Sequence, residues 1–280
     1  MAGFFLPGVS KAGYSAAPML TCSGLTVGMA GRTLVRNLTF NLAAGDVLCV
    51  LGPNGVGKTL TLHTLAGLSR PASGSIRLGG AELAKLPRRQ IAQRLGLLLQ
   101  DDAETFPATV LGTVLMGRHP HLTGAAAESA DDFARARSSL AAMNLDGLED
   151  RTVSTLSGGE RRRLGLARLL TQDTGVLLLD EPVTHLDPRH QLSVLKHVCG
   201  LGRSGRAVLM TLHDPCLAMR FASHALLLFP DGTWLLDTTP AALTAANLAR
   251  LFDTPYDEYV NDRGQTALQP TVLDDPTRCG

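Results

Sequence analysis

The chain has 280 residues, 45% of them hydrophobic, which is enough to bury the core of one domain with a subdomain. Its 26 Lys and Arg residues nearly balance its 25 Asp and Glu residues, and a net charge of +1 does not indicate a nucleic-acid or membrane-surface partner. The five cysteines include no C-x-x-C pair, which argues against structural disulfides and zinc.

Residues 1–18 are expected to form an N-terminal tail. They carry no basic segment before the short apolar run that Pro7 ends, so they do not resemble a signal peptide. No apolar run approaches the ~18–20 residues that span a bilayer, and we therefore expect a cytoplasmic protein. The alternating residues 19–50 predict a β-rich subdomain.

The next segment fits the phosphate-binding pattern G-x-x-x-x-G-K-[ST]. A buried strand is expected at Asp46–Leu51 and a helix at Leu60–Ala66, so the glycines would turn backbone N–H groups towards an anion at a helix N-terminus. Lys58 suits the β- and γ-phosphates, and the Thr59 hydroxyl suits Mg²⁺. Alone, the motif leaves a kinase, a GTPase, an ATPase or a plain glycine-rich turn open. The candidate nucleotide-binding residues are Gly52, Pro53, Asn54, Gly55, Val56, Gly57, Lys58, Thr59 and Leu60.

Further along, Pro71–Gly74 indicates a turn before a strand at Ser75–Leu78. Gln100 ends the apolar run Leu97–Leu99, where a lone Gln is usually a solvated or capping residue. Residues 104–155 are rich in Ala and Arg and predict a helical insertion, with a helix from about Ala125 to Met143.

Ser157 and Glu160 have the spacing of a capping box and predict a helix N-terminus. Gly158 and Gly159 would leave its N–H groups approachable by an anion, although a plain capped helix explains the same residues. The three arginines Arg161–Arg163 are expected to form a solvated face of this helix.

The strand predicted at Val176–Leu179 ends in two carboxylates. Asp180 is placed to hold Mg²⁺ through water, and Glu181 to polarise an attacking water as general base. Helices at 189–199 and 215–221 then alternate with strands at 207–212 and 225–229, which predicts a mainly parallel sheet. His213 follows the first of these strands, where a lone His is more often structural. Residues Gln265–Gly280 are expected to be irregular.

Six elements in this order resemble the ATP-binding subunit of ABC transporters over about residues 19–230. They are the P-loop, Gln100 as Q-loop, Leu156–Glu160 as the LSGGQ signature with Glu160 replacing Gln, Val176–Glu181 as Walker B, Leu186-Asp187 as D-loop and His213 as switch histidine.

The resemblance implies an α/β P-loop NTPase with a RecA-like core and a mainly parallel sheet. It adds an antiparallel β subdomain and a helical subdomain at about 104–155. The ABC ATPase domain would cover residues 19–262, and residues 263–280 would form a C-terminal tail.

The same resemblance implies ATP and Mg²⁺ as cofactors and a head-to-tail homodimer. The P-loop of one copy would face Ser157, Gly158 and Gly159 of the other. The metal would be held by Thr59, Gln100 and Asp180. Catalysis would involve Glu181 as base, His213 at the γ-phosphate and Gln100 as a sensor that signals to a membrane partner.

Residues Phe106–Leu122 resemble the segment that docks the permease in importers of ferric siderophores, haem and cobalamin. Met116, Gly117 and Arg118 would form a partly basic seat for a helix. His119 and His121 are expected in a surface turn rather than in a metal site. A substrate-binding protein would act indirectly, and the chain would lie at the cytoplasmic face of the inner membrane.

Alternatives remain at this point. A soluble ABC-type ATPase acting on DNA or as an assembly factor would need no permease, but the segment between Asp101 and Thr155 has neither heptads nor C-x-x-C. A soluble P-loop kinase is disfavoured by the signature and by Asp180-Glu181. One departure from the family is the lack of an adenine-stacking aromatic near Val27–Met29, where the Met29 sulfur could take its place.

Overall fold

The computed structural model describes residues 18–100, 108–124, 127–260, 262, 264 and 266–271. The expected N-terminal tail up to residue 17, the start of the docking segment at Phe106 and Pro107, and residues 272–280 lie outside the described residues.

A six-stranded sheet forms the centre of the molecule. Its order is β10-β9-β3-β8-β7-β6, and every neighbouring pair is parallel except β10 with β9. The strands are β3 (Val47–Leu51), β6 (Leu95–Leu98), β7 (Val176–Leu179), β8 (Ala207–Thr211), β9 (His224–Leu228) and β10 (Trp234–Thr238). The mainly parallel α/β sheet predicted from the sequence is thereby confirmed.

Both faces of this sheet are covered, because successive side chains of a strand point to opposite sides. In β3, Cys49 and Leu51 join a core with the helices of one face, whereas Leu48 and Val50 join a second core on the other. Uniformly apolar strands such as β3 and β7 follow from this double burial.

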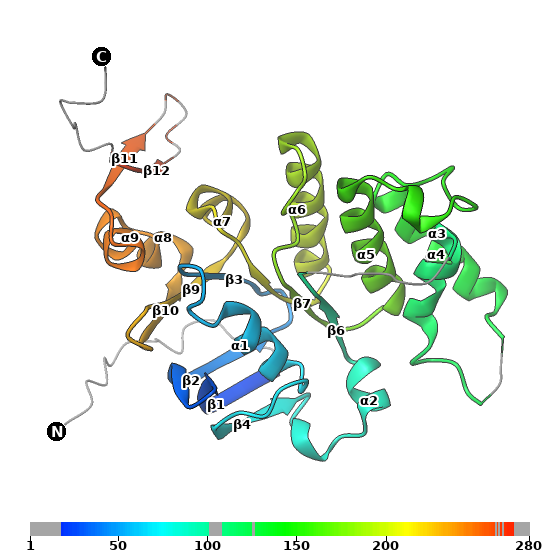
Figure 1. Ribbon diagram of the computed structural model, residues 1–280, viewed down its shortest axis with the longest axis horizontal. Coiled ribbons are helices and arrows are strands. Elements are labelled where there is room, and N and C mark those ends of the chain that lie inside the picture. The colour runs from blue at the N-terminus through cyan, green and yellow to red at the C-terminus, as the bar shows by residue number, and fades with distance from the viewer. Residues whose placement is uncertain are drawn as a thin grey trace.

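The second core lies between the main sheet and an antiparallel sheet of order β2-β1-β4-β5. Leu62 and Leu65 of α1 (Lys58–Leu65) pack there with Leu20 of β1. Figure 1 shows α1 beside the blue strands. The remaining elements of this part are β1 (Pro18–Met29), β2 (Arg32–Ala43), β4 (Ser73–Leu78), β5 (Ala81–Glu82), η1 (Leu83–Lys85) and α2 (Arg88–Ala92).

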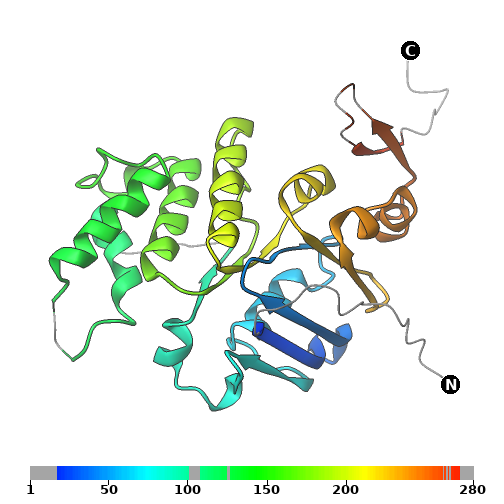
Figure 2. The same ribbon diagram turned by 180° about the vertical axis from the view of Figure 1, so that it is seen from behind.

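A helical subdomain lies at one end of the molecule, seen from both sides in Figures 1 and 2. In it α3 (Val110–Leu115) and α4 (Ala130–Ala142) pack against α5 (Gly158–Gln172) and each other. The short helices η2 (Met116–Arg118) and η3 (Val153–Thr155) complete it. The expected start of a helix at Ala125 is wrong for the described residues 127–129, since Ser129 caps α4 and bonds reciprocally with Asp132.

Helices α6 (Pro188–Arg203) and α7 (Pro215–Phe221) follow β7 and β8. The chain then forms α8 (Thr239–Ala242), α9 (Ala245–Phe252) and a hairpin of β11 (Tyr256–Val260) and β12 (Thr266–Pro270). The expectation of irregular structure is therefore wrong for residues 266–270, because Leu268 is buried in the core and holds the hairpin in place. No helix in the described part of the chain is long and apolar enough to cross a membrane.

Candidate functional site

Four neighbouring strands of the main sheet bring the predicted site residues to one edge. Since β3, β8, β7 and β6 are adjacent and parallel, their carboxyl ends meet there. The P-loop follows β3, His213 lies just after β8, Asp180 and Glu181 follow β7, and Gln100 lies just after β6. Residues separated by over a hundred positions thus form one site.

The P-loop offers backbone N–H groups at the start of α1. Gly57 caps this helix in the left-handed region at φ 108°, and among the described residues no side chain accepts a hydrogen bond at the cap. The first turn contains no acidic residue. An α-helix N-terminus leaves its first N–H groups without intrahelical partners, so this one is suited to an anion.

Two P-loop positions require glycine for reasons of space. A Cβ at Gly52 would lie 2.7 Å from the carbonyl oxygen of Leu228, and one at Gly57 would lie 3.0 Å from Cβ of Leu34. Gly57 also has a positive φ that strains other residues. The loop can therefore keep its path only with these glycines.

Lys58 is buried beneath the loop. Its Nζ donates to the carbonyl oxygens of Gly52 at 2.7 Å and Pro53 at 3.1 Å, which fixes the curl of the loop. Burial lowers the pKa of the ammonium group, while the charges of Glu181 and Asp180 act in the opposite direction. The lysine thus lies within electrostatic reach of both carboxylates.

Three side chains converge on the carboxylate of Glu181. His213 Nε2 lies 2.6 Å from its Oε1, and Gln100 Nε2 and Thr184 Oγ1 donate to its Oε2 at 3.3 and 3.1 Å. The Glu181 side chain is 9% exposed, whereas His213 is 47% exposed and Gln100 is also at the surface. A nearly buried carboxylate is therefore held at the rim of the site by polar groups from the segments that follow β6, β7 and β8.

Asp180 lies deeper, with no exposed surface. Its Oδ1 accepts from Thr211 Oγ1 at 2.8 Å, and the same hydroxyl accepts from the backbone N–H of Glu181 at 2.7 Å. Within the described residues, Oδ2 of Asp180 is buried and has no hydrogen-bond partner. Such an atom needs a ligand, since an unsatisfied buried carboxylate oxygen is costly.

These oxygens fit a divalent cation that arrives with a nucleotide. Mg²⁺ is usually bound by one or two carboxylates, with substrate phosphates and waters completing its shell. Asp180 Oδ2 supplies such a carboxylate, and the half-buried Thr59 lies in the P-loop across β8. Among the described residues no group of three His, Cys, Asp or Glu forms a protein-only metal cage.

The signature residues form the capping box expected from their spacing. Ser157 Oγ accepts from the backbone N–H of Glu160 at 3.2 Å, and Glu160 Oε2 accepts from that of Ser157 at 2.7 Å. Ser157 and Gly158 are exposed at the start of α5. The helix α5 packs with α3 and α4 in the helical subdomain, whereas α1 packs with β1. The signature and the P-loop therefore lie in different parts of the fold.

The arginines after the signature correct one expectation. Arg161 is exposed as predicted, but Arg163 is buried, with Nη1 donating to the carbonyls of Met143 and Asn144 at 2.8 Å each. Arg162 is half-buried and points to the strand ends. All three arginines lie one turn before buried residues of α5 (Gly165, Leu166 and Ala167), so helical spacing alone does not single out Arg162 and Arg163.

A shallow groove borders the described part of the docking segment. Met116 is 43% exposed at its edge, although Arg118 does not form the basic seat that was expected. Arg118 Nε instead pairs with the buried Asp132 at 2.7 Å, and its Nη1 donates to the carbonyl of Thr171. The groove holds about 170 Å³ and is lined by Leu97, Met116, Gly117, Pro120, Gly165, Arg168, Leu169 and Gln172.

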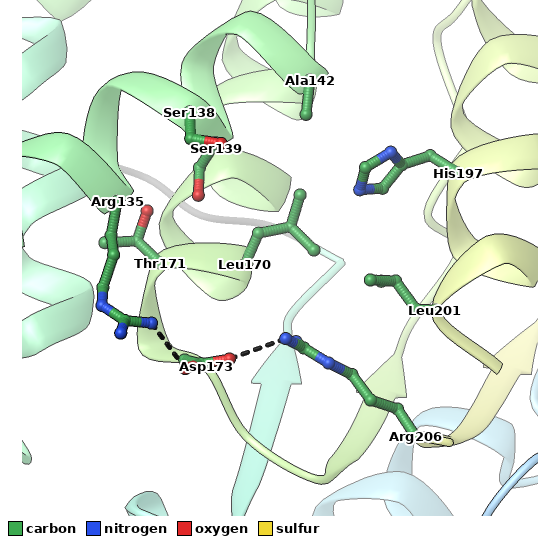
Figure 3. A pocket seen from close by; sticks show the side chains of 10 residues that line it. All are labelled: Arg135, Ser138, Ser139, Ala142, Leu170, Thr171, Asp173, His197, Leu201 and Arg206. Carbon is green, nitrogen blue, oxygen red and sulfur yellow. Dashed lines mark hydrogen bonds and ion pairs between the residues drawn. The ribbon is translucent and has the colours of Figure 1, made fainter. Parts of the chain in front are cut away.

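A second cavity of about 220 Å³ lies between α4, α5 and α6 (Figure 3). Asp173 lies between two arginines there and accepts from Arg135 at 2.8 Å and Arg206 at 2.6 Å. Burial and the charge of Arg206 lower the pKa of His197 on the opposite wall. These ion pairs fasten the end of α5 to α4 and to the segment before β8.

Comparisons with known proteins identify the family of the chain. The family described as ABC transporter matches residues 35–184. The chain is 40% identical to the hemin import ATP-binding protein HmuV of Gloeobacter violaceus, over 79% of this chain and 82% of that protein. It is 35% identical to the ferric enterobactin transport ATP-binding protein FepC of Escherichia coli, over 80% and 83%.

Solved structures give the same result for the fold. A metal-chelate type ABC transporter in an inward-facing conformation superposes with a TM-score of 0.80 at 30% identity, covering 91% of this chain and 98% of that one. A bacterial ABC transporter cassette described as dimeric superposes with a TM-score of 0.71 at 22% identity, covering 79% and 99%.

Proposed function

The chain belongs to the ABC transporter family and is an ATPase, and we propose that it powers the import of an iron chelate through separate membrane subunits. The relatives named for hemin and ferric enterobactin import support haem or a ferric siderophore as the cargo. Cobalamin, which the sequence pattern also favours, is the third chelate to be tested.

The observation that carries this function is the meeting of five side chains at the ends of parallel strands. Lys58 follows β3, Asp180 and Glu181 follow β7, Gln100 follows β6 and His213 follows β8. A phosphate cradle beside a buried carboxylate pair is what phosphoryl transfer to water requires.

In this proposal each residue has a separate part in hydrolysis. The P-loop N–H groups and Lys58 bind the phosphates of ATP, and Glu181 accepts a proton from the attacking water. His213 and Gln100, which already contact the Glu181 carboxylate, turn towards the γ-phosphate and signal its presence. Gln100 contacts the proposed base and precedes the docking segment in the chain. In this proposal it therefore links hydrolysis to the permease.

The Mg²⁺ site would use Thr59, Asp180 and Gln100. The unsatisfied Oδ2 of Asp180 supports this assignment. When bound, the ion would supply positive charge that offsets the negative charge developing during transfer.

A second copy of the chain would complete the nucleotide site. The exposed Ser157 and Gly158, with Gly159, lie at the N-terminus of α5, away from α1 in the packing. We propose a head-to-tail homodimer in which they contact the nucleotide held by the partner's P-loop. A solved cassette of similar fold is described as dimeric, which supports a dimer.

The groove beside Met116 is the proposed seat of a permease helix at the cytoplasmic face of the membrane. The exposed Met116, with the half-buried Leu97 beside it, suits the apolar side of an amphipathic helix. The alternative, a soluble ABC-type ATPase without a permease, would leave the exposed Met116 without a partner. The import relatives also favour the transporter.

Uptake by cells tests the proposal. Cells that depend on this chain would receive labelled haem, ferric siderophore or cobalamin, with the wild-type chain or Glu181→Gln as the ATPase. The exposed Glu258→Gln serves as a matched control. We expect Glu181→Gln to abolish uptake of one chelate and Glu258→Gln to leave it intact. Equal uptake of all three chelates with both variants would contradict the importer.

A further inference from the structure

One guanidinium group joins α5, the helix that begins at the signature, to the segments that follow strands β6 and β7. Arg162, in the first half of α5, donates through Nη1 to the carbonyls of Leu99 at 2.5 Å and Gln100 at 3.1 Å. Through Nη2 it donates to the carbonyls of Asp180 and, at 2.7 Å, of Glu181. Four backbone acceptors from two separate loops thus share one side chain.

This side chain has the chemistry to fix two loops at once. A guanidinium is planar, carries five N–H donors and stays charged at every pH at which the protein is folded. Hydrogen bonds from a charged donor are stronger than those between neutral groups. A lysine could supply the charge, but not the two parallel pairs of donors.

Part of the backbone that Arg162 holds has an unfavourable conformation. Glu181 has a φ of 49°, in the left-handed region that is unfavourable for residues with a Cβ. Its N–H is held by Thr211 Oγ1, whereas its carbonyl and that of Asp180 are held by Arg162. The orientation of the Glu181 carboxylate therefore depends on both contacts.

We propose that Arg162 is a positioning residue for ATP hydrolysis, which keeps Glu181 and Gln100 in register with each other and with the signature. The inference rests on the proposed role of Glu181 as base. Ser157–Gly159 precede Arg162 by only three to five positions on the same helix, so a movement of α5 reaches Glu181 directly.

The test is steady-state ATP hydrolysis by the full chain with Arg162→Ala, Arg162→Lys and Arg162→Gln. We expect Arg162→Ala to lower kcat at least about tenfold while KM for ATP changes by less than about threefold, since the P-loop is untouched. Lys and Gln should restore part of the rate, because each keeps some donors. Arg161→Ala, at the exposed neighbouring position, should leave both constants unchanged.

Binding of a fluorescent ATP analogue and the melting temperature separate positioning from folding. A purely structural role would reduce kcat only in proportion to the fraction of chains that bind nucleotide, and that result would overturn the inference. If Arg162→Ala does not fold, the Lys and Gln variants carry the same comparison.

A kcat within twofold of wild type in all three variants would also overturn the inference. Glu181→Gln, assayed alongside, separates the two claims. Normal hydrolysis by Glu181→Gln would refute the base itself, whereas its inactivity together with fully active Arg162 variants would refute only the role of Arg162.

Discussion

His213 Nε2 lies 2.6 Å from Glu181 Oε1 across the ends of β8 and β7. This contact pairs an exposed histidine with a carboxylate that is almost buried, and Gln100 and Thr184 occupy the other carboxylate oxygen. A general base needs such an oriented carboxylate, which supports the proposed role of Glu181.

Glu181→Gln should keep ATP binding and lose hydrolysis. The amide retains the size of the side chain but cannot accept a proton from water, and general acid–base catalysis contributes about 10²–10⁴-fold. Phosphate release measures the rate, and equilibrium binding of ATP measures the affinity. Hydrolysis by Glu181→Gln near the rate of the control Glu258→Gln would show that another group is the base.

Lys58→Ala should weaken ATP binding about tenfold or more, since in the proposed site it removes a charged donor to phosphate oxygens, and such a contact is worth about 1.5–3 kcal/mol. It also frees the carbonyls of Gly52 and Pro53, which loosens the loop. Calorimetric titration with ATP measures the change. Lys85→Ala is the matched control, because this lysine is exposed and pairs only with Glu82 among the ion pairs of the described residues. Equal affinities of the two variants would argue against the P-loop assignment.

Met29→Tyr should strengthen ATP binding. Met29 ends β1 with 66% of its surface exposed, where an aromatic ring could stack on adenine. Base–aromatic stacking is worth about 1–3 kcal/mol, so a gain of about fivefold is expected over the thioether. The comparison of affinities for ATP and for tripolyphosphate isolates the base contribution. Leu68→Tyr, at another exposed apolar position, should have no effect, and an unchanged Met29→Tyr affinity would remove Met29 from the adenine site.

The acid stability of the helical subdomain should depend on Asp132. Hydrogen bonds from Ser129 and then Arg118 lower the pKa of this carboxyl from 3.8 to about 2. A pKa that is lower in the folded state stabilises the fold above pH 3.8, and this contribution is lost as the pH falls through about 2.

Asp132→Asn should therefore be less stable than wild type at pH 7 by about 1–2 kcal/mol, with the difference shrinking below pH 4. Urea unfolding at pH 7, 5, 4 and 3 measures this trend. Asp146→Asn, at an exposed position, is the control. A difference that stays constant down to pH 3 would show that Asp132 acts without its charge.

The main sheet and its site could be predicted because the information is local. β3, β7 and β8 are short, mainly apolar runs, and the residues of a motif follow each of them within a few positions. Parallel strands then bring those residues together without further information. The capping box at Ser157 could likewise be predicted from the sequence, since Ser157 and Glu160 lie within one helical turn.

The features that sequence analysis missed depend on contacts between distant segments. Arg161 and Arg162 are the same residue type on the same turn, and only the position of β6 and β7 decides that Arg162 is held and Arg161 is solvated. Similarly, Leu268 forms a strand because the core beside α7 receives it. Arg118 faces Asp132, fourteen positions away, rather than the surface.

The central claim is that two chains share each nucleotide. The molecular mass of the Glu181→Gln variant in solution, measured with and without ATP, tests this claim most directly. If a nucleotide lies between the P-loop of one chain and the signature of another, blocked hydrolysis should trap a dimer that needs ATP. Adding Ser157→Arg to the same chain should prevent that dimer while ATP still binds. A Glu181→Gln chain that binds ATP and keeps the same mass with and without it would contradict the shared site.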